Sequence, residues 1–144
     1  MAHLGDLRGN LQTVAGTVFP NFSFISNVFN IRMSQPRGPG HIEMQSWCIV
    51  PKDAPSVVKT AMRTIYSLTF GPAGMVESDD CENWVSMTQA SASPLSHGVP
   101  FFLGMGLGET FTDPELPGLL SGAWSEHSMR GYWQNWLRWT GASR

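Results

Sequence analysis

Hydrophobic and polar residues alternate along the first third of the chain with the two-residue period of β-strands. Residues 13–25 are rich in β-branched and aromatic side chains, and apolar positions alternate there with polar ones. The alternation continues through residues 29–34 and 42–50, on either side of a turn-rich segment at 35–40. Because this six-residue connection is too short for a parallel crossover, the pattern predicts an antiparallel hairpin or meander.

A helical period replaces the alternation after residue 52. Asp53 and Pro55 predict a helix start, with a capping acid and an early proline. The apolar residues that follow form one stripe, made of Val57, Val58, Ala61, Met62, Ile65 and Tyr66. Glycines at 71–74 end this helix, and a second helix is predicted over about residues 75–90.

The last third of the chain contains most of the remaining glycine and proline. Residues 91–122 are therefore predicted to be loops with one short strand at 101–105. A final helix over about 125–140 has an apolar face formed by Met129, Tyr132, Trp133, Trp136 and Leu137. The elements together predict a single α+β domain, an antiparallel sheet with packed helices.

Composition narrows the classes of partner. Charged residues make up 14% of the 144 residues, against roughly 25% in typical soluble domains. With six tryptophans and eight phenylalanines, such a chain is expected to bury surface against more than itself. A net charge of −2 without a Lys/Arg run argues against nucleic acid. No apolar run is long enough for a membrane span, and the first residues lack a signal-peptide core, so we expect a cytoplasmic protein.

The candidate chemistry lies in the acidic segment 77–84, which follows a glycine-proline bend and has apolar neighbours. A carboxylate in apolar surroundings usually binds a metal or takes part in acid–base catalysis, because burial of an uncompensated charge costs free energy. A solvated acidic helix start is the alternative, since acids favour the positive end of the helix dipole. Cys81 lies in the same segment and is interpreted as a passive small residue rather than a ligand.

Three segments then carry a resemblance to a known family: TVFPNFSF at 17–24, PRGP at 36–39 and FGPAGMVESDDCENW at 70–84. They resemble, in order and spacing, the large (alpha) subunit of Rieske non-haem iron aromatic-ring-hydroxylating dioxygenases of the naphthalene and biphenyl dioxygenase type. The resemblance runs from about residue 4 to the last helix. It implies a helix-grip (START/Bet v1-like) catalytic domain that is incomplete, with 1–144 as its C-terminal part and the Rieske domain absent.

The resemblance also implies a metal ligand. A mononuclear Fe(II) oxygenase uses two histidines and one carboxylate, and the family carboxylate falls on Asp80 rather than on its neighbour Asp79. The family histidines come from a helix upstream of this sequence. The four histidines present, which are not spaced as a helical pair, are His3, His41, His97 and His127. The isolated piece is therefore expected to be inactive.

By the same resemblance, five positions line the substrate site: Thr13, Ala15, Ile25, Phe70 and Val76. Relatives often carry a large aromatic at the position of Val76, so a valine implies a roomier pocket. The alternative is that these are ordinary core residues, the common fate of Phe or Val. Arg32 and Arg37 either pair with a substrate carboxylate or are surface arginines beside the turn.

The implied reaction is oxidative. Electrons from NADH pass through a reductase, usually with a ferredoxin, and then through the [2Fe-2S] Rieske cluster to the mononuclear iron. There both atoms of dioxygen are added to an aromatic ring, and the product is a cis-dihydrodiol. A beta subunit and alpha–alpha contacts are the implied partners. Two other hypotheses remain open: a non-catalytic domain that binds hydrophobic ligands, and an inert truncated domain. A serine hydrolase is disfavoured because no Gly-x-Ser-x-Gly is present.

Overall fold

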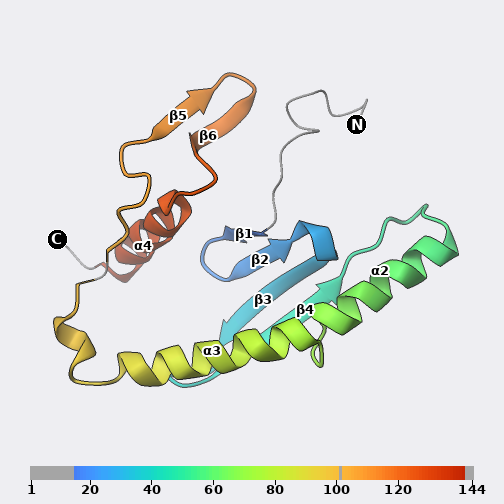
Figure 1. Ribbon diagram of the computed structural model, residues 1–144, viewed down its shortest axis with the longest axis horizontal. Coiled ribbons are helices and arrows are strands. Elements are labelled where there is room, and N and C mark those ends of the chain that lie inside the picture. Colours follow the sequence, from blue (N-terminus) through green and yellow to red (C-terminus); the bar gives the residue numbers. More distant parts are fainter. Residues whose placement is uncertain (1–14, 101, 142–144) are drawn as a thin grey trace. The chain divides into compact units, whose positions relative to one another are not determined.

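In the computed structural model, which describes residues 15–100 and 102–141, the chain divides after Ser93 into two compact units. The first unit contains a four-stranded antiparallel sheet in the order β1-β2-β3-β4, one 3-10 turn and two helices (Figure 1). Its elements are β1 (Ala15–Val18), β2 (Phe22–Ile25), η1 (Ser26–Val28), β3 (Asn30–Pro36), β4 (Ile42–Cys48), α2 (Ser56–Thr69) and α3 (Met75–Ser91). The predicted antiparallel meander is confirmed.

The single strand predicted over 13–25 is wrong, because its described part is a hairpin. β1 and β2 pair antiparallel from Ala15 opposite Ile25, with a turn at residues 19–21. Pro20 lies in this turn, where it interrupts the strand because proline has no N–H for the sheet ladder. The ring of Phe24 lies over Gly16 of β1, so a Cβ at this position would displace the ring.

The strand register defines which side chains share a face of the sheet. Paired residues lie on the same face, and successive residues alternate between faces. One row across three strands is Ser23, Arg32 and Ser46, and the row beside it on that face is Ala15, Ile25, Asn30 and Cys48. This face carries the two most deeply buried polar residues of the sheet, Asn30 and Arg32. The face of β3 that is covered is therefore the one with its polar side chains.

Helix α2 is tied to this polar face by a chain of hydrogen bonds. The Tyr66 hydroxyl donates to Ser46 Oγ at 2.9 Å, and Ser46 Oγ donates to Asn30 Oδ1 at 3.0 Å. Asn30 is only 1% exposed, so its side chain needs such a partner. The apolar core of the described residues is small and consists of Val28 and Met62. In this unit, hydrogen bonds such as those of Ser46 therefore contribute much of the contact between the helix and the sheet.

The helices of the first unit begin and end close to the predicted positions. Helix α2 starts at Ser56 after Pro55, but no side chain caps it, so the predicted capping by Asp53 is wrong. Of its predicted apolar stripe, Met62 is buried and Tyr66 half-buried, whereas the other members are exposed. Helix α3, Met75–Ser91, confirms the helix predicted over 75–90.

The second unit contains η2 (Ser96–Gly98), a hairpin of β5 (Thr110–Asp113) and β6 (Leu116–Ser121), and α4 (His127–Thr140). The strand predicted at 101–105 is wrong for residues 102–105, which form no strand, and residue 101 lies outside the described residues. Arg130 of α4 holds this segment by donating to the carbonyl oxygens of Leu103, Met105 and Gly106. None of the described helices has the length and apolar character needed to cross a membrane.

Candidate functional site

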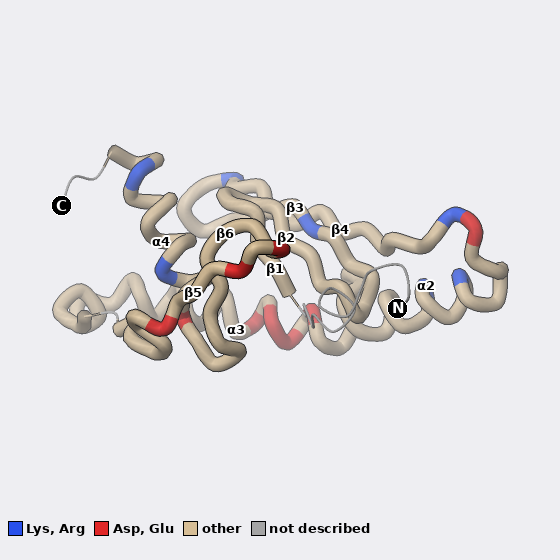
Figure 2. The backbone as a smooth tube through the Cα atoms, turned by 90° about the horizontal axis from the view of Figure 1, so that it is seen from above, with Lys and Arg blue, Asp and Glu red and all other residues tan. Residues whose placement is uncertain are grey.

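The acidic residues of α3 form a concentrated charged stretch in a chain that is otherwise mostly uncharged (Figure 2). Their environments differ along one turn of the helix. Glu77 is buried, Asp79 is exposed and Asp80 is half-buried. The prediction of a solvated acidic helix start therefore holds for Asp79 but not for Glu77. Because residues three and four apart share a helix face, Asp80 lies on the same side as Glu77 and Val76.

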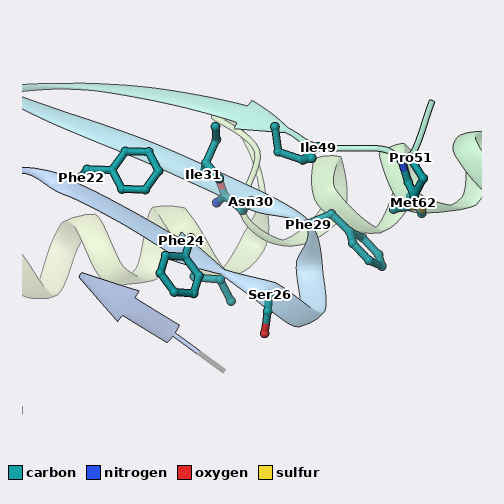
Figure 3. A pocket seen from close by; sticks show the side chains of 10 residues that line it. Phe22, Phe24, Ser26, Phe29, Asn30, Ile31, Ile49, Pro51 and Met62 are labelled. Atoms are coloured by element: carbon teal, nitrogen blue, oxygen red, sulfur yellow. The ribbon is translucent and has the colours of Figure 1, made fainter. Parts of the chain in front are cut away.

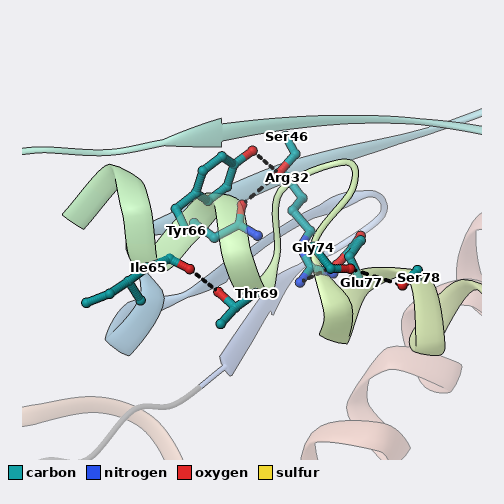
Figure 4. Close-up of polar contacts among 9 residues, drawn as sticks. Arg32, Ser46, Ile65, Tyr66, Thr69, Gly74, Glu77 and Ser78 are labelled. Carbon is teal, nitrogen blue, oxygen red and sulfur yellow. Dashed lines mark hydrogen bonds and ion pairs between the residues drawn. The ribbon is translucent and has the colours of Figure 1, made fainter. Parts of the chain in front are cut away.

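Glu77 is paired with Arg32 of β3. Arg32 Nη2 lies 3.0 Å from Glu77 Oε2, and the two side chains are 7% and 8% exposed (Figure 4). Burial raises the pKa of the Glu77 carboxyl above its usual range; the Arg32 charge opposes this shift and the Asp80 charge adds to it. Desolvation thus outweighs the attraction of the guanidinium, as expected for an ion pair taken out of water.

The interpretation of Arg32 as a surface arginine is wrong, and its charge is already compensated by Glu77 rather than left for a substrate carboxylate. Arg37 is a surface residue, as the alternative predicted. Its guanidinium pairs with Glu43 at 2.6 Å across the turn between β3 and β4, and both side chains are largely exposed. The two arginines of this hairpin are therefore paired differently: Arg32 with the buried Glu77 of α3, and Arg37 with the exposed Glu43 of β4.

Phe70 contacts the same arginine. The Arg32 Cζ atom lies 4.9 Å from the centre of the Phe70 ring, within the range of a cation–π contact. Phe70 directly follows α2, and Val76 lies in the first turn of α3; both side chains are half-buried. The predicted pocket residues Phe70 and Val76 therefore flank the bend between the two helices, with the buried ion pair beside them.

Two of the remaining predicted pocket residues, Ala15 and Ile25, lie at the start of the sheet. Ala15 and Ile25 are opposite each other in β1 and β2 and share the face that carries Arg32. Ala15 is exposed and Ile25 half-buried. Thr13 lies outside the described residues. The structure thus brings Ala15 and Ile25 together as one pair, and Phe70 and Arg32 as another.

An apolar hollow of about 490 Å³ opens beside this part of the sheet (Figure 3). Its volume lies within the range of small-molecule sites. Most of its lining is aromatic or aliphatic, and of the four predicted pocket residues that the structure describes, only Ile25 takes part. The lining residues are Phe22, Phe24, Ile25, Ser26, Phe29, Asn30, Ile31, Ile49, Pro51 and Met62.

The described residues supply one candidate metal ligand rather than a complete site. Over residues 15–100 and 102–141, no group of three or more His, Cys, Asp or Glu side chains is placed to hold a metal ion. Asp80 is half-buried and has the chemistry of a carboxylate ligand, so it fits one position of a triad. The Cys81 side chain is exposed, yet partial desolvation, followed by the Glu77 and Asp80 charges, raises the pKa of its thiol, which favours the protonated, weakly ligating form.

Comparisons with known proteins identify the family to which the chain is related. A family model described as "Ring hydroxylating alpha subunit (catalytic domain)" matches residues 6–142. The alpha subunit of biphenyl 2,3-dioxygenase from Rhodococcus jostii (strain RHA1) is 39% identical over 138 residues, covering 94% of this chain and 30% of the relative. The alpha subunit of benzene 1,2-dioxygenase from Pseudomonas putida is 37% identical over 124 residues, covering 85% and 28%.

Among solved structures, naphthalene 1,2-dioxygenase with indole bound in the active site superposes with a TM-score of 0.75. Its sequence is 31% identical to this one, and the match covers 83% of this chain and 27% of that chain. The predicted α+β class and the resemblance to the ring-hydroxylating dioxygenase alpha subunit are thereby confirmed. The chain spans about 30% of the length of the curated relative from Rhodococcus.

Proposed function

The chain belongs to the family of ring-hydroxylating alpha subunits (catalytic domain), and we propose that it is the C-terminal part of the catalytic domain of an aromatic-ring-hydroxylating dioxygenase. The match of the family model over residues 6–142 carries this proposal. The reaction adds both atoms of dioxygen to an aromatic ring and gives a cis-dihydrodiol. Relatives named for biphenyl and benzene, together with a neighbour that binds indole, support an aromatic substrate.

Asp80 is the residue we assign to a mononuclear non-haem Fe(II). When bound, such an iron supplies the activation of dioxygen, which side chains alone do not provide. Asp80 contributes one negative oxygen ligand from the second turn of α3, and its half-buried position leaves the carboxylate accessible. The two histidine ligands of the family are proposed to come from outside the described residues; the chain covers 30% of the Rhodococcus relative. The chain alone is therefore expected to be inactive.

The residues around Asp80 would position the substrate rather than react with it. Phe70 and Val76, one on each side of the bend before α3, are proposed to form one wall of the pocket, with Ile25 and Ala15 on the sheet side. Thr13, which lies outside the described residues, is proposed as a further pocket residue. Such a wall excludes water and orients a flat apolar ring. Because Val76 is smaller than an aromatic residue, the pocket is proposed to accept bulkier ring systems.

Electrons are proposed to come from NADH through a reductase or ferredoxin and a [2Fe-2S] Rieske cluster carried by another part of the alpha subunit. A beta subunit and neighbouring alpha subunits are proposed as partners in the cytoplasm. The many large apolar side chains that are exposed, such as Trp84 and Met87 of α3, support packing against further protein.

The proposal is tested by isotope incorporation. The native enzyme that contains this sequence is incubated with biphenyl, NADH and ¹⁸O₂, and the product is analysed by mass spectrometry. We expect a dihydrodiol that carries two labelled oxygen atoms. A product with one labelled oxygen indicates a monooxygenase, and the absence of any oxygenated product contradicts the assignment.

A second candidate function is supported by the apolar hollow of about 490 Å³. A domain of this kind could bind hydrophobic molecules without iron, because a hollow lined by aromatic side chains provides the burial that such ligands require. Naphthalene binding to the 144-residue chain, followed by tryptophan fluorescence, separates the two functions. If the chain binds naphthalene while the native enzyme yields no labelled dihydrodiol, the binding function is favoured.

A further inference from the structure

Arg32 lies at a junction that joins the sheet to both sides of the bend between α2 and α3. From β3 its guanidinium contacts Phe70, the residue directly after α2, and Glu77, in the first turn of α3. Phe70 belongs to the proposed substrate wall, and Glu77 precedes the proposed ligand Asp80 by one helical turn. One side chain of the sheet therefore contacts the neighbourhoods of both the substrate and the metal.

The contact with Glu77 depends on charge more than on directed hydrogen bonding. The two charged atoms lie 3.0 Å apart, yet neither Arg32 Nη2 nor Glu77 Oε2 takes part in a hydrogen bond of good geometry within the described residues. Any cation at this position would therefore retain much of the attraction to Glu77. Since Glu77 is buried, the loss of that cation would leave a desolvated carboxylate without compensation.

The contact with Phe70 depends on the shape of the guanidinium. A flat, weakly hydrated guanidinium stacks on an aromatic ring, whereas the compact ammonium of lysine is strongly hydrated and stacks less well. At 4.9 Å from the ring centre, the Arg32 Cζ atom is close enough for such stacking. A lysine at position 32 would therefore retain the charge and weaken the contact that orients the ring.

The backbone of the bend is fixed independently of Arg32. The N–H groups of Phe70 and Gly71 both donate to the carbonyl oxygen of Tyr66, and Gly74 leaves no room for a side chain against the backbone of Thr69. Tyr66 also anchors α2 to the sheet through Ser46 (Figure 4). Removal of Arg32 would therefore release the Phe70 ring and the first turn of α3 rather than the whole helical layer.

From these contacts we propose that Arg32 is a positioning residue: through Phe70 it fixes one wall of the substrate pocket, and through Glu77 it fixes the turn of α3 that presents Asp80. This inference rests on the proposed function of Asp80 and Phe70. The two roles use different properties of one side chain, the planar shape for Phe70 and the positive charge for Glu77. Substitutions that remove one property at a time therefore separate the roles.

The test uses Arg32→Lys and Glu77→Gln in the native enzyme, with Arg37→Lys as the matched control at the exposed Arg–Glu pair. Three quantities are measured: the isomer ratio of dihydrodiols from a monochlorobiphenyl, the affinity of the iron-depleted enzyme for Fe²⁺, and the melting temperature. Arg32→Lys is expected to shift the isomer ratio by about threefold or more, the change that corresponds to the free energy of a cation–π contact. The Fe²⁺ affinity of this variant is expected to change little. Glu77→Gln is expected to weaken Fe²⁺ binding by about tenfold, as for other residues that orient a metal ligand, with little change in the isomer ratio.

The positioning role is supported if Arg32→Lys changes only the isomer ratio and Glu77→Gln changes only the Fe²⁺ affinity. A merely structural defect would change the isomer ratio and the Fe²⁺ affinity together with the melting temperature. An unchanged isomer ratio in Arg32→Lys overturns the role toward Phe70, and an unchanged Fe²⁺ affinity in Glu77→Gln overturns the role toward Asp80. Parallel changes that follow the melting temperature overturn both. If Asp80→Ala binds Fe²⁺ as tightly as the wild type, the proposed ligand is wrong, while the isomer ratio still decides the role toward Phe70.

Discussion

Replacement of Arg32 by methionine is expected to be among the most destabilising single substitutions in the sheet. The side chains of Arg32 and Glu77 are 7% and 8% exposed, so methionine would leave a buried carboxylate without its cation. Breaking a buried pair from one side costs about 3–5 kcal/mol of the free energy of unfolding. Replacing both partners by apolar residues removes the uncompensated charge, so Arg32→Met with Glu77→Met is expected to recover most of this loss.

The exposed pair of the same region provides the internal comparison. The side chains of Arg37 and Glu43 are 60% and 46% exposed, and such surface pairs contribute about 0–1 kcal/mol. The assay is urea unfolding of the full chain at pH 7, with the four single variants and the two double variants forming two double-mutant cycles. The reasoning is refuted if Arg32→Met costs no more than Arg37→Met, or if the double variant at the buried pair is as unstable as Arg32→Met alone.

Three further predictions follow from the same unit. Because the pKa of Glu77 is raised in the folded state, this residue contributes stability below its usual pKa of 4.5 that is lost as the pH rises through the raised value. The wild type should therefore lose free energy of unfolding relative to Glu77→Gln as the pH rises above 4.5 in urea titrations, and an opposite slope contradicts this. Gly74→Ala is expected to lower the free energy of unfolding by about 2 kcal/mol or more, since its Cβ would overlap the Thr69 carbonyl; an unchanged urea midpoint contradicts this. Tyr66→Phe is expected to cost about 1 kcal/mol through the lost hydrogen bond to Ser46, and no loss in the same assay contradicts it.

Much of the fold could be predicted because its signals are local. The helical period after Pro55, the glycines at 71–74 and the alternation around the turn at 35–40 each belong to one stretch of sequence, and the observed helices and strands follow them. The hairpin of β5 and β6 was missed because glycine and proline dominate residues 91–122. The sequence did contain a turn-forming residue there, Asp113; in the structure its carboxylate accepts a hydrogen bond from the N–H of Glu115, the contact of an Asx turn.

The face of a strand is harder to predict than its period. In β3 the apolar residues alternate with Asn30, Arg32 and Ser34, and alternation alone does not say which set is covered by helices. The structure covers Asn30 and Arg32, and it compensates them with Ser46 and Glu77, which are far away in the sequence. Only the three-dimensional pairing shows that an arginine next to a turn belongs to the buried layer.

In the candidate site, too, one part could be predicted from the sequence and another could not. Asp80 was assigned through the resemblance of its segment to a family, and its role as a metal ligand stays a prediction. The environment of α3, in which Glu77 is buried and Asp79 is exposed, could not be deduced from a run of acids, because neighbouring carboxylates on a helix point in different directions. That difference also provides the control for the decisive experiment.

The central claim, that Asp80 is a ligand of a mononuclear iron, is tested most directly by the iron content of the native enzyme in three forms: wild type, Asp80→Ala and Asp79→Ala. The two substitutions remove the same group from adjacent positions of α3, so their effects on net charge are equal. We expect Asp80→Ala to lose the mononuclear iron while Asp79→Ala retains it. Full iron content in Asp80→Ala, or equal loss in both variants, would contradict the assignment.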